Sequence, residues 1–84
     1  MSNKIESVEV LGSGCPKCHK LLEITNEVLS QLGLDIKVIY VTEIDRMIAM
    51  GIMSTPALAI NSRPVLSGRL PSSEEVREII SKYL

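Results

Sequence analysis

The sequence predicts an α/β fold in which a four-stranded mixed sheet carries helices on both faces. Strand-like and helix-like hydrophobic patterns follow one another in the order β-α-β-α-β-β-α. Each of the two strand–helix–strand units favours parallel pairing with a right-handed crossover. The last two strand-like runs are joined only by Asn61-Ser62, which is typical of an antiparallel hairpin. The sheet is therefore expected to mix the two pairings.

Length and composition narrow the class of protein. The 84 residues suffice for one core, so we expect a single domain over residues 1–84. A net charge of −1 and two tyrosines as the only Phe, Tyr or Trp residues give no basic surface or stacking platform for nucleic acid. No apolar run resembles a membrane span or a signal peptide. We expect a cytoplasmic protein with no nucleic-acid or membrane partner.

The first strand is predicted over residues 4–11 and ends at the Gly12-Ser13-Gly14 stretch. The longest helix then begins with Pro16, whose missing N–H is not needed at a first helical position, and ends at Gly33. Thr25 interrupts its apolar stripe. The stripe consists of Cys18, Leu21, Leu22, Val28, Leu29 and Leu32.

The remaining elements are shorter. A second strand is predicted over residues 36–41, and Thr42 with Asp45 resembles a capping box for a short helix that ends at Gly51. The next two strands cover residues 57–60 and 64–67, and Pro64 predicts that the latter lies at the sheet edge. Ser72 and Glu75 form a second capping pattern, followed by the apolar positions of a last helix: Val76, Ile79, Ile80 and Tyr83.

The two cysteines lie where the first strand gives way to the first helix. In a reducing compartment such a close pair is more often catalytic or metal-binding than structural. The partial positive charge of the helix N-terminus favours a thiolate at Cys15, and Lys17 adds a nearby cation. Cys18 shares the apolar stripe and is expected to point inward. We therefore predict that Cys15 is a nucleophile and that Cys18 is the thiol that resolves its product.

Two stretches resemble a known family: Val10-Leu11-Gly12-Ser13-Gly14-Cys15-Pro16-Lys17-Cys18 and Gly51-Ile52-Met53-Ser54-Thr55-Pro56-Ala57-Leu58. The sequence is similar to the thioredoxin superfamily, specifically the small prokaryotic thioredoxin-like redox-active disulfide proteins. The resemblance implies a thioredoxin-like fold and a thiol–disulfide oxidoreductase that exchanges disulfides with protein clients, in either direction of electron flow. We expect no cofactor and no metal. It also implies that Pro16 and Lys17, between the cysteines, tune the redox couple.

The resemblance further implies a cis peptide bond between Thr55 and Pro56. These two residues would form the wall opposite the disulfide, where the Thr55 backbone can pair with an extended client segment. The alternative is a trans proline that merely starts the next strand. Glu9 lies six residues before Cys15, where thioredoxins place a buried carboxylate that assists proton transfer. We favour an exposed strand glutamate at this position.

Other functions remain open. Paired thiolates also suit a soft-metal carrier for Cu(I) or Zn²⁺, although such carriers usually have another element order. A pure binding module with a vestigial cysteine pair is a further class. His19 completes the Cys-x-x-Cys-His pattern of c-type haem attachment, with methionines as conceivable axial ligands, but the strand–helix context argues against haem. The methionines concerned are Met47, Met50 and Met53.

The electron donor is a separate question. Glutaredoxins carry a glutathione clamp, which Ser67-Gly68-Arg69 matches only in part. A glutathione-dependent, glutaredoxin-like protein is therefore an alternative, with Arg69 as the residue that would meet a glutathione carboxylate. We favour a flavin-dependent enzyme of the thioredoxin-reductase type as the donor, because the apolar residues Ile52 and Met53 near Thr55 suit a protein surface.

Overall fold

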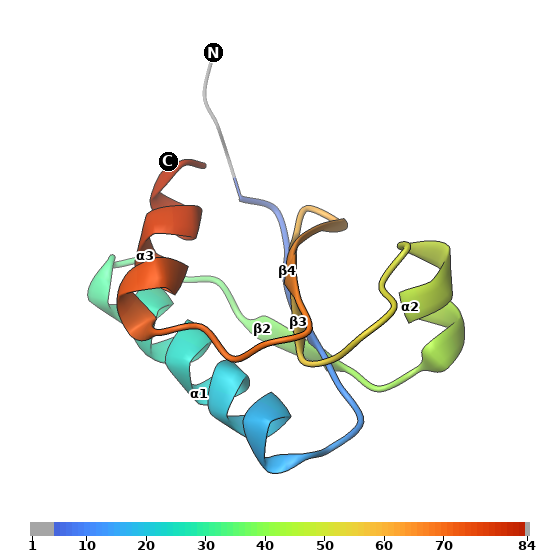
Figure 1. Cartoon of the computed structure of the whole chain (residues 1–84). Coiled ribbons are helices and arrows are strands. Elements are labelled where there is room, and N and C mark those ends of the chain that lie inside the picture. The colour runs from blue at the N-terminus through green and yellow to red at the C-terminus, as the bar shows by residue number, and fades with distance from the viewer. Residues whose placement is uncertain (1–4, 84) are drawn as a thin grey trace.

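The computed structural model describes residues 5–83 and has the predicted element order (Figure 1). Residues 1–4 lie outside the described residues. They include the first residue of the predicted strand 4–11 and the start of the segment in which no signal peptide is predicted. The elements are β1 (Val8–Leu11), α1 (Pro16–Gln31), β2 (Val38–Val41), α2 (Ile44–Ala49), β3 (Ala57–Ile60), β4 (Arg63–Ser67) and α3 (Ser73–Ser81).

The four strands form one mixed sheet in the order β2-β1-β3-β4. β1 lies in the interior of the sheet, parallel to β2 and antiparallel to β3, and β4 pairs antiparallel with β3. The expected edge position of the strand that contains Pro64 is confirmed. Asn61 and Ser62 both have positive φ, as the tight turn between β3 and β4 requires. The predicted four-stranded mixed sheet is therefore confirmed.

One expected pairing is wrong. The second strand–helix–strand unit, β2-α2-β3, is not parallel, because Leu11 at the end of β1 pairs with both Val41, the last residue of β2, and Ala57, the first residue of β3. β3 thus starts at the end of the sheet where β2 finishes. The intervening chain crosses from one side of β1 to the other without returning to the opposite end, and the six residues of α2 rise only about 9 Å.

One face of the sheet is covered by α1 and α3, which pack side by side (Figure 1). Thr25, which interrupts the apolar stripe of α1, is buried there, and its Oγ1 donates a 2.8 Å hydrogen bond to the Leu21 carbonyl. The hydroxyl is thus satisfied within the helix. The buried core of this face consists of Val8, Val10, Leu21, Val28, Leu29, Leu58, Ile60, Val76 and Ile80.

α2 lies on the opposite face, so helices cover both faces as expected (Figure 1). Met47 of α2 and Ile52 after it pack against the small side chains of Ala57 and Ala59 and against Leu11. The alternation along β1 therefore sends Val8 and Val10 to one face and Glu9 and Leu11 to the other.

The helix starts differ in how they are capped. The Thr42 capping box is wrong: Glu43 is the N-cap of α2 and its side chain makes no capping hydrogen bond. At α3 the Ser72 hydroxyl accepts a hydrogen bond from the Glu75 N–H at 3.2 Å, as the sequence pattern indicates. β2 begins at Val38, two residues later than predicted. No helix within residues 5–83 has the length and apolarity to span a bilayer.

Candidate active site

The two cysteines lie at the carboxyl end of β1, where the chain turns into α1. Gly14 adopts a φ of +86°, which turns the chain so that Cys15 becomes the N-cap and Pro16 opens the helix. Cys15 Sγ accepts a hydrogen bond from the Cys18 backbone N–H at 3.4 Å. The sulfur thus caps a helix N-terminus, where a negative charge is stabilised by the helix dipole.

The two thiols differ in exposure. Both are free in this structure, but Cys15 is half-buried and Cys18 is completely buried beneath the first turn of α1. Pro16 and Lys17, the residues between them, are exposed. A disulfide approaching from solvent can therefore reach Cys15, whereas Cys18 is accessible chiefly to its own neighbour.

Burial and hydrogen bonding act in opposite directions on the Cys18 thiol. Burial raises the pKa of the Cys18 thiol, but hydrogen bonds from the Cys15 thiol and from backbone N–H groups of residues 13–15 outweigh burial and hold this pKa below its ordinary value. Hydrogen bonding to a thiolate favours the charged form. These hydrogen bonds therefore favour a thiolate at Cys18 despite its burial, and exposure decides which sulfur a client meets.

Gly12 is a site residue that sequence reasoning missed. A Cβ at this position would overlap Cys18 Sγ, lie 2.6 Å from Cys18 Cβ and lie 3.2 Å from Tyr40 Oη. The missing side chain therefore makes room for the inward-pointing thiol. In the sequence, Gly12 could be seen only as a strand stop.

Tyr40 of β2 is the second residue that sequence reasoning missed. Its hydroxyl oxygen accepts a hydrogen bond from the Gly14 N–H at 2.9 Å, and its ring packs on His19 of α1 with centroids 5.5 Å apart. His19 is thus engaged with an aromatic ring beside the cysteines. The available signal was a lone aromatic residue near the carboxyl end of the strand that pairs with β1.

The loop before β3 lies at the same end of the sheet as the cysteines, because Leu11 and Ala57 are register partners. The Thr55–Pro56 peptide bond in this loop is cis, Thr55 is half-buried and Pro56 is buried. The Pro56 carbonyl accepts a hydrogen bond from the Gly68 N–H at 2.9 Å, which ties the loop to the end of β4.

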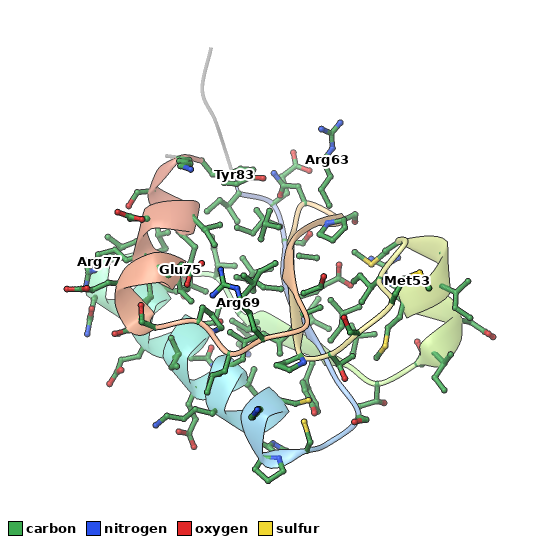
Figure 2. All side chains as sticks on the ribbon, in the orientation of Figure 1. Met53, Arg63, Arg69, Glu75, Arg77 and Tyr83 are labelled. Atoms are coloured by element: carbon green, nitrogen blue, oxygen red, sulfur yellow. The ribbon has the colours of Figure 1, made fainter. Side chains whose placement is uncertain are left out.

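Met53, earlier in this loop, is 94% exposed and lies beside α2 (Figure 2). Ile52 is instead buried in the core of the α2 face, so it cannot contribute to an apolar rim as we expected from the sequence. Met47 is also buried in that core, where it is part of the packing of α2. The exposed thioether is therefore the apolar contact that this loop offers to solvent.

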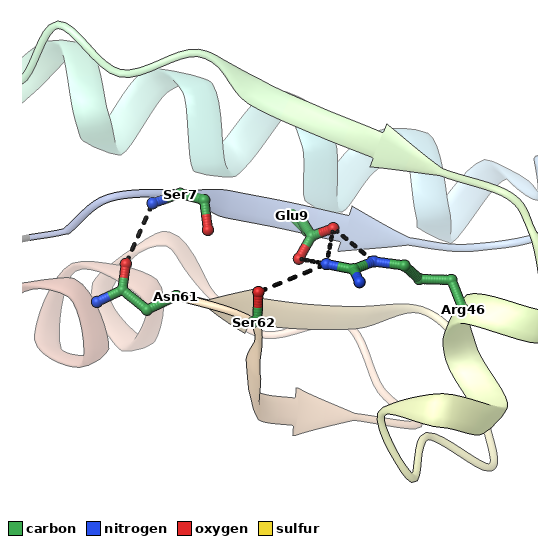
Figure 3. Close-up of polar contacts among 5 residues, drawn as sticks. All are labelled: Ser7, Glu9, Arg46, Asn61 and Ser62. Atoms are coloured by element: carbon green, nitrogen blue, oxygen red, sulfur yellow. Dashed lines mark hydrogen bonds and ion pairs between the residues drawn. The ribbon is translucent and has the colours of Figure 1, made fainter.

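The expectation that Glu9 is exposed is wrong. Glu9 is 5% exposed, and Arg46 of α2 binds its carboxylate through Nε at 3.0 Å and Nη2 at 2.9 Å (Figure 3). Period-two alternation turns Glu9 toward α2, where the guanidinium compensates a charge that burial alone would penalise. Glu9 thus faces α2, whereas α1, the helix that contains Cys18, covers the other face of the sheet.

Arg69, the residue proposed for a glutathione clamp, is paired with Glu75 of α3 (Figure 2). A hydrogen bond from Arg69, aided by its charge, lowers the pKa of Glu75, and the same contact raises the pKa of Arg69. A glutathione carboxylate would have to displace Glu75 from the guanidinium. Among residues 5–83 there is no group of three or more His, Cys, Asp or Glu side chains that could hold a metal ion.

A family model and two curated proteins match this chain over most of its length, and they agree with one another. A family model described as a thioredoxin domain matches residues 6–81. A thioredoxin of Methanocaldococcus jannaschii is 34% identical over 77 residues, which cover 92% of this chain and 88% of the relative. A thioredoxin of Methanothermobacter thermautotrophicus is 30% identical over 74 residues, which cover 88% of this chain and 96% of the relative.

Proposed function

This chain belongs to the thioredoxin family and is a thiol–disulfide oxidoreductase, and we propose that Cys15 and Cys18 form its dithiol–disulfide couple. The observation that carries the proposal is the contrast between the two sulfurs. Cys15 is a partly exposed N-cap on a helix N-terminus, and Cys18 is buried one turn further on. This arrangement suits one thiol that attacks and one that resolves.

The proposed reaction has two exchange steps. Cys15 Sγ, as the thiolate, attacks a client disulfide, so that a bond forms between Cys15 and one client sulfur while the other client sulfur leaves with the electron pair and takes up a proton. Cys18 then loses its proton and attacks Cys15 Sγ. The Cys15–Cys18 disulfide forms, the mixed disulfide breaks, and the second client sulfur leaves as a thiolate. Two electrons have passed from the dithiol to the client.

Thr55 and Pro56 are proposed to bind the client backbone. Their loop lies at the same end of the sheet as the cysteines, and Thr55 is only half-buried. An extended client segment could pair with the Thr55 backbone as an added strand. The exposed Met53 in the same loop would supply an adaptable apolar contact. Thioredoxins act on disulfide-containing proteins, and the same class of client is expected here.

The proposal also covers the electron donor and the cellular compartment of this protein. A flavin-dependent reductase of the thioredoxin-reductase type is favoured over glutathione, because Arg69 is already engaged by Glu75. We place the activity in the cytoplasm, where a pair of this kind is kept reduced, and we treat residues 1–84 as one functional domain. Pro16 and Lys17 remain proposed as tuning residues, since both are exposed beside the attacking sulfur.

Trapping of a mixed disulfide tests the proposal. With insulin as a defined disulfide client, Cys18→Ser should accumulate a covalent complex through Cys15, because no thiol is left to release it. The matched variant Cys15→Ser should accumulate none, and the wild-type protein should reduce insulin without accumulating the complex. Complex formation by Cys15→Ser, or by neither variant, would overturn the assigned roles.

A further inference from the structure

Tyr40 brings a hydroxyl from β2 to the buried thiol. Its Oη accepts the Gly14 N–H at 2.9 Å. A Cβ built on Gly12 would meet both Cys18 Sγ and Tyr40 Oη, so the sulfur and the phenol oxygen flank the same glycine. The surroundings of Gly12 therefore place the hydroxyl close to Cys18, and the hydrogen bond from Gly14 fixes the phenol oxygen there.

The phenol has a hydrogen to donate. Because its oxygen accepts from the Gly14 backbone, its own O–H remains free to turn toward another acceptor. The thiols of Cys15 and Cys18 are the charged groups that act on this phenol, and the ring of His19 packs on the ring of Tyr40. Burial raises the pKa of Tyr40 most, the hydrogen bond from the Gly14 N–H lowers it, and the neighbouring thiols of Cys18 and Cys15 raise it further. Tyr40 thus keeps its proton at the pH where a thiolate forms.

Glu9 is not available for the same task. Both of its carboxylate oxygens are held by Arg46, and they face α2 on the side of the sheet away from Cys18. The carboxylate is therefore held in the ion pair with Arg46 and faces away from the thiols. Any polar assistance to the buried sulfur has to come from the α1 face, where Tyr40 lies.

We propose that the Tyr40 hydroxyl donates a hydrogen bond to Cys18 Sγ when this sulfur is ionised, and so stabilises the reduced couple and the attacking form of the resolving thiol. The inference rests on the proposed function and adds the Tyr40 hydroxyl as a group that tunes the redox potential of the Cys15–Cys18 couple. In the resolving step, Cys18 gives its proton to water and attacks Cys15 Sγ, the client thiolate leaves, and Tyr40 supplies only the hydrogen bond. His19 orients the phenol through ring packing.

The first test measures the reduction potential of the couple against glutathione from pH 6 to pH 9. For Tyr40→Phe, the equilibrium constant for reduction should fall about tenfold at the alkaline end, which corresponds to a potential about 30 mV more negative. The bend that marks thiol ionisation in the plot of potential against pH should move to higher pH. A hydrogen bond to a charged sulfur predicts this shift, whereas a purely structural role does not.

Two variants serve as controls. Tyr83→Phe removes a phenol hydroxyl from a residue just after the C-terminus of α3 and should leave the bend in place (Figure 2). His19→Leu removes the ring partner and keeps the phenol, so it should move the bend less than Tyr40→Phe. An unchanged bend in Tyr40→Phe, or an equal shift in His19→Leu, would show that the hydroxyl does not act on the sulfur.

A second measurement does not depend on whether Tyr40→Phe folds. In Tyr83→Phe, Tyr40 is the only tyrosine, so the absorbance of tyrosinate reports its ionisation alone. The apparent pKa of Tyr40 should be higher in the reduced protein than in the oxidised protein, because only the reduced form places a thiolate beside the phenol. Equal values would overturn the inference. If the wild-type Cys15 and Cys18 formed no reversible disulfide at all, the proposed function would fall instead, so the two failures are distinguishable.

Discussion

Gly12 determines how closely Cys18 can pack against the end of β1. A Cβ added at Gly12 would overlap the Cys18 side chain. The added Cβ and the Cys18 Cβ are each bonded directly to the backbone, so neither can turn away from the other. We predict that Gly12→Ala destabilises the fold by about 1–3 kcal/mol, the usual cost of overpacking, and displaces the buried thiol. Urea unfolding and the rate at which Cys18 is alkylated measure the two effects.

Gly14→Ala is the matched comparison for this prediction. A Cβ there meets no neighbouring atom, but the φ of +86° is unfavourable for alanine. Its stability should fall through backbone strain alone, with Cys18 as protected as in the wild-type protein. Equal exposure of Cys18 in both variants would contradict the specific role of Gly12.

Among the elements, α3 depends on its cap. The Ser72 hydroxyl accepts from the Glu75 N–H, and α3 covers the core with Val76 and Ile80. Ser72→Ala should lower the free energy of unfolding by about 1 kcal/mol, because one N–H of the first turn loses its acceptor. Ser73→Ala, at the exposed first helical position, should change it by less than about 0.5 kcal/mol. Denaturant unfolding of both variants gives the comparison.

The elements also show where sequence reasoning succeeds. Hydrophobic periodicity, glycine stops and the Ser72 cap are local signals, and they predicted the order of all seven elements and the helix start at Pro16. The direction of β3 is not local, because it depends on whether the chain around α2 returns along the sheet. Periodicity places Glu9 on a face but cannot reveal that Arg46, 37 residues later, will cover it.

The same distinction applies to the site. Two thiols at this spacing between a strand and a helix predict an exposed and a buried sulfur from the pattern alone. Tyr40 and Gly12 become site residues only when β2 lies beside β1 and α1 packs over both. The hydrogen bond between Gly14 and Tyr40 joins segments separated by 26 residues, so no spacing rule could have found it.

At the scale of the whole molecule, the ion pair of Glu9 and Arg46 joins α2 to the central strand on the face away from the thiols. Arg46→Met leaves a buried carboxylate without its partner, so we predict a loss of stability of about 2 kcal/mol. The double variant Glu9→Gln with Arg46→Met should recover part of this loss, because no charge stays buried.

Arg63→Met, on the exposed edge strand β4, is the matched control and should be close to neutral (Figure 2). Thermal unfolding of the wild-type protein, the two single variants and the double variant provides the comparison. Insulin reduction by Arg46→Met, measured well below its unfolding temperature, should stay near the wild-type rate, since the pair faces away from Cys18. A fall in this rate as large as that of Cys15→Ser would mean that Glu9 takes part in the chemistry.

The account as a whole depends on the unequal roles of the two sulfurs, and alkylation of the reduced protein tests it most directly. Ionisation and exposure act in different directions here, because hydrogen bonds lower the pKa of Cys18 while the fold buries it completely. Brief treatment with iodoacetamide at pH 7, followed by peptide mapping, should label Cys15 at least tenfold faster than Cys18. Equal labelling, or faster labelling of Cys18, would contradict the assignment of Cys15 as the nucleophile.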